Sequence, residues 1–134
     1  MESIPAGLFA KISGSASYMF NSTFQYCSSL QSIPSGLFSG VTTTNSGLFS
    51  YTFQGCTGLK SIPSNLFENL SGAMEAGMLK NMFYGCTSLT GESAKIGTQF
   101  LYKKWPDATT AQVGGCYSGA TGLTDYSSIP TNWK

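Results

Sequence analysis

The chain of 134 residues contains no histidine and no arginine. Only 10% of its residues are charged, whereas roughly 25% are charged in a typical soluble domain. The formal net charge is +1. Nucleic-acid binding requires a basic stripe that contacts phosphates, so we do not expect a nucleic-acid partner. No run of about 18 apolar residues occurs, so we expect no membrane span in this chain.

The missing histidines also weaken most catalytic and metal-binding interpretations. A serine nucleophile would lack its usual base. The four cysteines stand far apart in sequence, whereas zinc sites usually contain C-x2-C pairs with histidine partners. A paired-carboxylate site is disfavoured, because the acidic residues fall in no repeated column. These residues are Glu2, Glu68, Glu75, Glu92, Asp107 and Asp125. We therefore expect no enzyme, no catalytic residue, no metal site and no cofactor.

A repeat dominates what the sequence does contain. Cys27, Cys56, Cys86 and Cys116 are 29, 30 and 30 residues apart. The first three lie in the phrases FQYCSSL, FQGCTGL and FYGCTSL, and the fourth lies in a weaker copy, VGGCYSG. A second anchor, Ser-Ile-Pro, begins at residues 3, 32, 61 and 128. Segments of 29 residues that start at Ile4 and at Ile33 match at 13 positions. A period of this length is typical of a solenoid.

The pattern within one repeat predicts three short elements. Residues 56–63, CTGLKSIP, end at a proline and suit a short strand that lies parallel to its neighbours. The segment after the proline suits a short helical turn, with the Leu37-Phe38 and Leu66-Phe67 pairs inside. Residues 48–53 and 78–83 suit a return strand or an irregular helical turn.

These predictions divide residues 1–134 into a single domain. Its repeats cover about 4–32, 33–61 and 62–91, and an irregular capping repeat covers 92–134. In the last unit Asp107 follows a proline and suits the N-cap of a short helix. Trp105 and Trp133 suit a lid over the final repeat, with stacking on a ligand as the alternative.

The four cysteines suit a ladder of buried thiols. Stacked repeats would bring neighbouring cysteines within disulfide range. Equivalent side chains in a stack point the same way, however, so we expect free thiols that behave as small hydrophobes.

The repeat anchor at Ser3 lies almost at the first residue of the chain. We expect that targeting residues or further repeats have been removed, and the alternative is a short natural chain that is capped by its own first turn. A cut repeat would expose an apolar edge. Self-association through the N-terminal edge is therefore a possible partner interaction.

The phrases FQGCTGLKSIPSNLF and FYGCTSLTG, and the closing GLTDYSSIPTNWK, resemble the BspA-like leucine-rich repeats of bacterial surface proteins, also called the Treponema pallidum type. The resemblance is close over residues 3–91 and loose over 92–134, and the period is longer than usual for the family. It implies an α/β leucine-rich-repeat solenoid of about four repeats, with short parallel strands and short helical turns. It also implies a secreted or surface-anchored adhesion module.

Residues that vary around the repeated phenylalanines are candidates for contact with a partner. Tyr26, Tyr51, Asn81 and Tyr84 belong to a face that is rich in tyrosine and amides and nearly free of charge. Such a face suits a host or bacterial surface protein or a neutral glycan, since tyrosine gives rigid contact area at low entropic cost. The alternative is that these residues only face solvent.

The sequence thus predicts a non-enzymatic adhesion module that is extracellular or lies at the cell surface. One alternative is a structural segment of a larger surface or phage tail-associated assembly. Another is a carbohydrate-binding accessory module.

Overall fold

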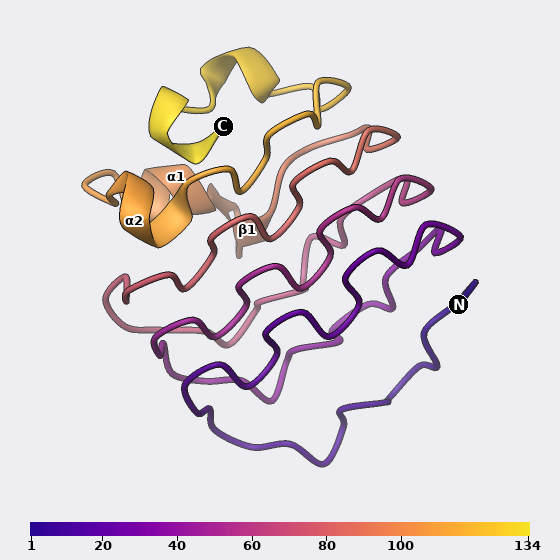
Figure 1. Ribbon diagram of the computed structural model, residues 1–134. Helices are drawn as coiled ribbons and strands as arrows, with labels where there is room; N and C mark the ends of the chain where they lie inside the picture. The colour runs from indigo at the N-terminus through magenta and orange to yellow at the C-terminus, as the bar shows by residue number, and fades with distance from the viewer.

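The computed structural model describes residues 1–134, and all of its regular elements lie after residue 94 (Figure 1). The strands β1 (Lys95–Ile96) and β2 (Gln99–Phe100) pair antiparallel. Two helical turns follow, α1 (Leu101–Lys104) and α2 (Thr110–Val113). The 3₁₀ turns η1 (Tyr126–Ser128) and η2 (Thr131–Trp133) end the chain. None of the helices is long and apolar enough to cross a membrane.

The predicted α/β leucine-rich-repeat solenoid of about four repeats is wrong. The single sheet of the molecule is the antiparallel β1–β2 hairpin, and no repeat contributes a strand or a helix to residues 1–94. The segment 56–63 makes only one backbone bond to the preceding copy, from the N–H of Lys60 to the carbonyl of Gln31. One bond followed by a proline is too little for a parallel ladder.

The return segments, predicted as strands or irregular helical turns, fold as unbroken chains of tight turns. We call them row 1 (residues 16–27), row 2 (45–56), row 3 (75–86) and the shorter row 4 (112–120). In row 1 every second N–H, from Met19 to Cys27, donates to the carbonyl three residues earlier. Rows 2 and 3 repeat this pattern, and row 4 keeps part of it.

A left-handed residue at every fourth position produces these rows. Each turn spans four residues, and in every second turn the third residue has positive φ, as a type II turn requires. This backbone fits neither strand nor helix, which is the physical reason that the predicted elements do not form. The left-handed residues are Tyr18, Ser22 and Tyr26 in row 1, Gly47, Tyr51 and Gly55 in row 2, Gly77, Asn81 and Gly85 in row 3, and Gly115 and Gly119 in row 4.

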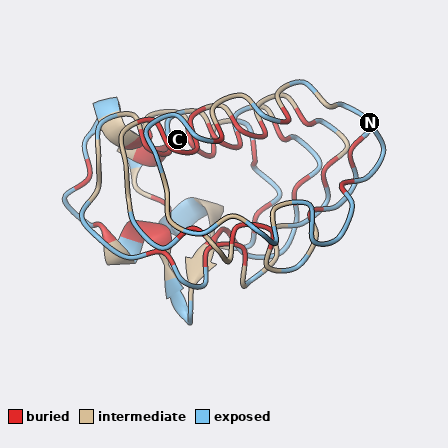
Figure 2. Ribbon diagram, turned by 90° about the horizontal axis from the view of Figure 1, so that it is seen from below, coloured by how far each residue is buried: buried red, intermediate tan, exposed pale blue.

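The rows lie side by side because the remaining N–H groups donate to the next row (Figure 1). For example, the N–H of Phe24 donates to the carbonyl of Thr52 at 2.9 Å, and that of Phe53 donates to Met82 at 2.9 Å. Each row thus alternates one bond within its own turns and one bond to its neighbour. Buried stretches recur beside one another along the stack, and exposed stretches lie at its outer corners (Figure 2).

Files of aromatic rings form the core between the rows. Phe24, Phe53, Phe83 and Tyr117 stack in order, with centroids 5.4, 5.6 and 5.8 Å apart and planes within 12° of parallel. Trp133 stacks on Tyr117 at 6.3 Å and ends the file. Each buried phenylalanine contributes roughly 1.5–3 kcal/mol. The Leu37-Phe38 and Leu66-Phe67 pairs are buried, as predicted.

The fourth cysteine is out of register with the other three. The N–H of Phe83 donates to the carbonyl of Cys116, as the N–H of Phe53 donates to Met82. Cys116 therefore takes the place of Met82, so the alignment of the fourth copy on this cysteine is wrong. The leucine that stands three residues after the cysteine in the first three copies has its equivalent in the buried Leu123, not in Gly119.

The C-terminal unit closes its end of the stack. Trp133 is fully buried, and its carbonyl accepts the N–H of Tyr117 at 2.9 Å. Trp105 is also buried and donates its Nε1–H to the carbonyl of Gly72 at 3.1 Å. Both tryptophans thus pack as the predicted lid. The helix expected from Asp107 starts later, because Thr109 is the N-cap residue of a capping box.

Candidate recognition surface

The outer side of the turn rows carries the residues nominated from the sequence. In rows 1 to 3 the left-handed positions face outward, and a buried phenylalanine or leucine stands two residues after the first two of them. Tyr26 and Tyr84 are exposed, at 67% and 45%, and Tyr51 and Asn81 are half-buried. The turn backbone therefore fixes which side chains reach this surface.

Tyr26 lies over a glycine of the next row. A Cβ added at Gly55 would overlap the ring of Tyr26, so the glycine both allows positive φ and makes room for the ring. The carbonyl of Tyr84 accepts the N–H of Gly55 at 2.7 Å. Tyr26 and Tyr84 therefore stand on either side of Gly55, at the same end of the rows.

Tyr51 and Asn81 share another column, in adjacent rows. Both have positive φ, 58° and 53°, two residues before the buried Phe53 and Phe83. The Asn81 amide overlies Gly115 of row 4, where an added Cβ would overlap its Oδ1 and approach the ring of Tyr84. The structure thus brings all four nominated residues onto one surface, over rows 1 to 3.

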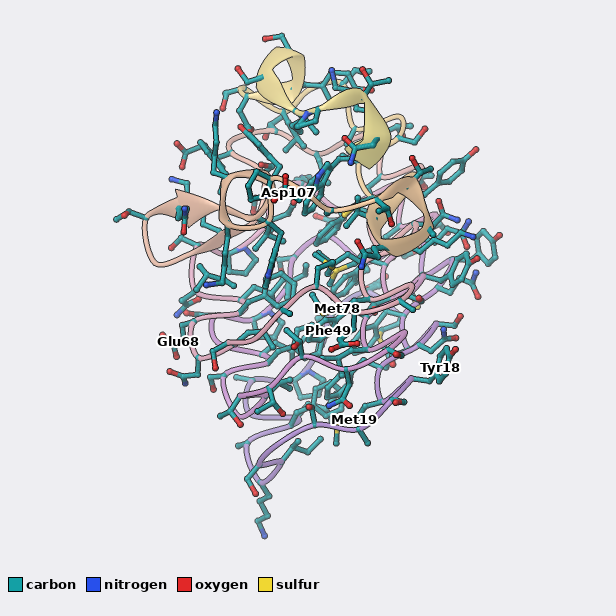
Figure 3. All side chains as sticks on the ribbon, turned by 90° about the vertical axis from the view of Figure 1, so that its left-hand side faces the viewer. Tyr18, Met19, Phe49, Glu68, Met78 and Asp107 are labelled. Carbon is teal, nitrogen blue, oxygen red and sulfur yellow. The ribbon has the colours of Figure 1, made fainter.

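Sequence reasoning missed Tyr18. Its side chain is 64% exposed, its φ is 57°, and its ring overlies Gly47 as that of Tyr26 overlies Gly55. Figure 3 shows Tyr18 projecting outward at the edge of the stack. The available signal was the glycine at the equivalent positions of rows 2 and 3, which marks an outward left-handed site.

The surface has little charge and is held by polar bonds between rows. Rows 1 and 2 contain no charged residue, and row 3 contains Glu75 and Lys80. The side chains of Gln25 and Gln54 bond to each other across rows 1 and 2. A fixed, neutral, tyrosine-bearing surface can recognise a partner through ring stacking and hydrogen bonds to hydroxyl groups.

The cysteines lie beneath this surface as free thiols, and three are buried. The Cys56 thiol donates to the carbonyl of Phe24, and the Cys86 thiol to that of Phe53, both at 3.1 Å. Burial raises the pKa of Cys56 to about 11 and that of Cys86 to about 12, and the neighbouring cysteine adds to each shift. Protonated thiols of this kind are weak nucleophiles and weak metal ligands. No group of three potential metal-ligating side chains comes together.

A second region with concave shape lies beside the C-terminal unit. A hollow of about 310 Å³ is lined by Met74, Lys104, Trp105, Asp107 and Gln112 together with three smaller side chains. The Gln112 side chain of its lining is already bonded within the chain. The Gln112 amide donates to the Met74 carbonyl at 3.2 Å, and its oxygen accepts the Thr109 N–H at 2.8 Å. The hollow therefore borders the lid and contains none of the nominated residues.

A carboxylate in the lid has a structural role. Asp125 accepts the backbone N–H of Ser93 at 2.9 Å, the Ser93 hydroxyl at 2.5 Å and the Tyr102 hydroxyl at 3.1 Å. Burial raises the pKa of Tyr102 to about 12, and the negative charge of Asp125 adds to the increase. These bonds tie the residue before η1 to the segment before β1.

Comparison of the chain with family models, with curated proteins and with solved structures finds no match. The resemblance to BspA-like repeats consequently rests on the repeated phrases alone.

Proposed function

We propose that the protein is a non-enzymatic recognition module that binds a surface protein through the outer side of rows 1 to 3. The contact residues are Tyr26, Tyr51, Asn81 and Tyr84, joined by Tyr18. The proposal places the module outside the cell or at the cell surface, in keeping with the motif resemblance.

One observation supports the proposal: strained backbone coincides with tyrosine side chains that are exposed or half-buried on the outer side. Tyr18, Tyr26 and Tyr51 have positive φ at positions where a glycine would be free of strain. A non-glycine residue in this conformation costs roughly 1–2 kcal/mol. Strain of this kind concentrates at functional sites, where the side chain is needed more than the relaxed backbone.

The test is binding of the purified chain to a panel of immobilised extracellular-matrix and serum proteins, and to an array of neutral glycans. We expect saturable binding to a protein, lost in a Tyr26→Ala, Tyr51→Ala, Tyr84→Ala variant. Alanine keeps the left-handed strain, so thermal stability should change little. A matched control replaces the exposed Lys60, Ser64 and Glu68 by alanine, outside the rows, and should bind normally.

A triple tyrosine variant that binds like the parent chain would contradict the proposal. Binding only on the glycan array would instead support the carbohydrate-binding alternative.

The uncovered N-terminal end favours a second candidate, a structural segment of a larger surface or phage tail-associated assembly. In that role the rows act as a spacer. The tyrosine substitutions would then leave assembly unchanged, whereas substitutions at the N-terminal end would prevent it.

A further inference from the structure

Row 1 forms the N-terminal end of the stack, and nothing in the chain covers it. Met19 is 38% exposed, whereas its equivalent in row 2, Leu48, is fully buried. Cys27 is half-exposed, whereas Cys56 is fully buried. Three further side chains at this end are also more exposed than the buried residues 29 positions later. They are Phe9, Ile12 and Thr23, and their equivalents are Phe38, Val41 and Thr52. Figure 3 shows Met19 nearer this end of the molecule than Phe49 and Met78.

The backbone of row 1 adds a second property to this end. Every N–H of residues 18–27 is used, either inside the row or toward row 2. Five carbonyls have no partner in the chain, those of Ser17, Met19, Asn21, Thr23 and Gln25. Their equivalents in row 2 all accept an N–H from row 1, namely Ser46, Leu48, Ser50, Thr52 and Gln54. The row therefore ends in an edge that only accepts hydrogen bonds.

This polarity decides between possible occupants. Two copies that met through their N-terminal ends would set carbonyls against carbonyls, with no backbone donor on either side. The opposite end of a second copy offers few donors, because the N–H of Tyr117 already donates to the carbonyl of Trp133 and only those of Gly115 and Gly119 lack a partner in row 4. Self-association through the N-terminal edge, expected from the sequence, thus lacks enough backbone donors for the five carbonyls.

We propose that the N-terminal edge docks a partner polypeptide that folds against it as one further turn row. The partner donates alternate backbone N–H groups to the five carbonyls and covers Met19, Thr23 and Cys27 with apolar side chains. The interface would continue the contact between rows 1 and 2, which is itself repeated between rows 2 and 3. The inference does not depend on the tyrosine surface.

The experiment supplies such a row and watches Cys27. A copy of residues 32–60 is placed before Ser3, where its last residue meets the Ser-Ile-Pro anchor as Lys60 meets Ser61. Cys56 within the copy is replaced by alanine, so that it adds no thiol. Cys27 should become protected from a thiol reagent, with its rate reduced at least about tenfold, and the thermal midpoint should rise.

Two further variants make the result specific. A copy of residues 61–90, with its cysteine replaced by alanine, should protect Cys27 equally. A copy of residues 32–60 with aspartate in place of both phenylalanines of its turn row should leave Cys27 reactive. The proposal is overturned if neither intact copy protects Cys27. It is also overturned if the unmodified chain sediments as a dimer in which Cys27 is protected, because the edge would then bind a second copy.

Discussion

Rows 1 and 2 have the same hydrogen-bonding pattern and closely related sequences, yet they differ in burial and in strain. Row 2 lies between two neighbours, and row 1 has only one. Three non-glycine residues of row 1 have positive φ, whereas row 2 has one, Tyr51. Equivalent positions are therefore not energetically equivalent, because in a stack the neighbouring row decides what a side chain contributes. We expect row 1 to be the least stable of the three full rows.

The largest expected effect tests this difference in burial. Leu48→Ala removes a fully buried side chain and should lower the free energy of unfolding by about 2–5 kcal/mol. Met19→Ala, at the equivalent position of row 1, should cost less than about 1 kcal/mol, since Met19 is partly exposed already. Urea unfolding of both variants measures the contrast. Equal losses would mean that row 1 is covered in solution.

The next effect concerns the contact between Tyr26 and Gly55. Gly55→Ala adds a side chain at positive φ and drives its Cβ into the Tyr26 ring, so we expect a loss of about 2–3 kcal/mol. Gly91→Ala is the matched control, because Gly91 has the same φ of 72° with open space around it. That control should lose only about 1–2 kcal/mol.

Thermal unfolding of Tyr26→Ala with Gly55→Ala checks the cause. The double variant should recover most of the difference between Gly55→Ala and Gly91→Ala. No recovery would show that the ring is free to move away.

A smaller effect separates the thiols of the two rows. Burial raises the pKa of Cys56 from 9.0 to about 11 in the folded chain. The folded state therefore holds this proton more tightly, and the stability that is complete below pH 9 is lost as the pH rises through 11. Between pH 8.5 and pH 11 the free energy of unfolding should fall less in Cys56→Ala than in Cys27→Ala, by about 1 kcal/mol. Urea midpoints at pH 8.5 and pH 11 measure it, and equal sensitivity would contradict the assigned burial.

The sequence predicted the core better than it predicted the backbone. The period identified which phenylalanines and leucines face inward, because apolar spacing depends on burial and not on the type of local structure. It suggested strands, however, because Tyr18, Ser22 and Tyr26 conceal in row 1 the left-handed positions that glycine reveals in rows 2 and 3. The signal for turns was glycine that recurs at fixed positions of rows 2 and 3, although the equivalent positions of row 1 hold residues that tolerate positive φ poorly.

The fourth copy shows a second limit. Its cysteine lies 30 residues after Cys86, which imitates the spacing of the earlier copies. In the structure the α1–α2 segment takes up extra residues, and Tyr117 rather than Val113 continues the file of rings. Only the contact with Phe83 settles that register. The nominated surface residues remain predictions of contact, and their common location follows from a backbone that spacing alone did not define.

The smallest effect tests strain directly in row 1. Tyr26→Gly should be more stable than Tyr26→Ala by about 1 kcal/mol, because both variants lose the ring but only glycine relieves the positive φ of 59°. Thr23 is the control, because it is also exposed but its φ is not positive. There Thr23→Gly should be less stable than Thr23→Ala, because glycine costs backbone entropy. Thermal midpoints of the four variants measure both differences. If glycine is the less stable choice at both positions, the row 1 backbone relaxes at Tyr26, and strain ceases to support the role of this tyrosine in recognition.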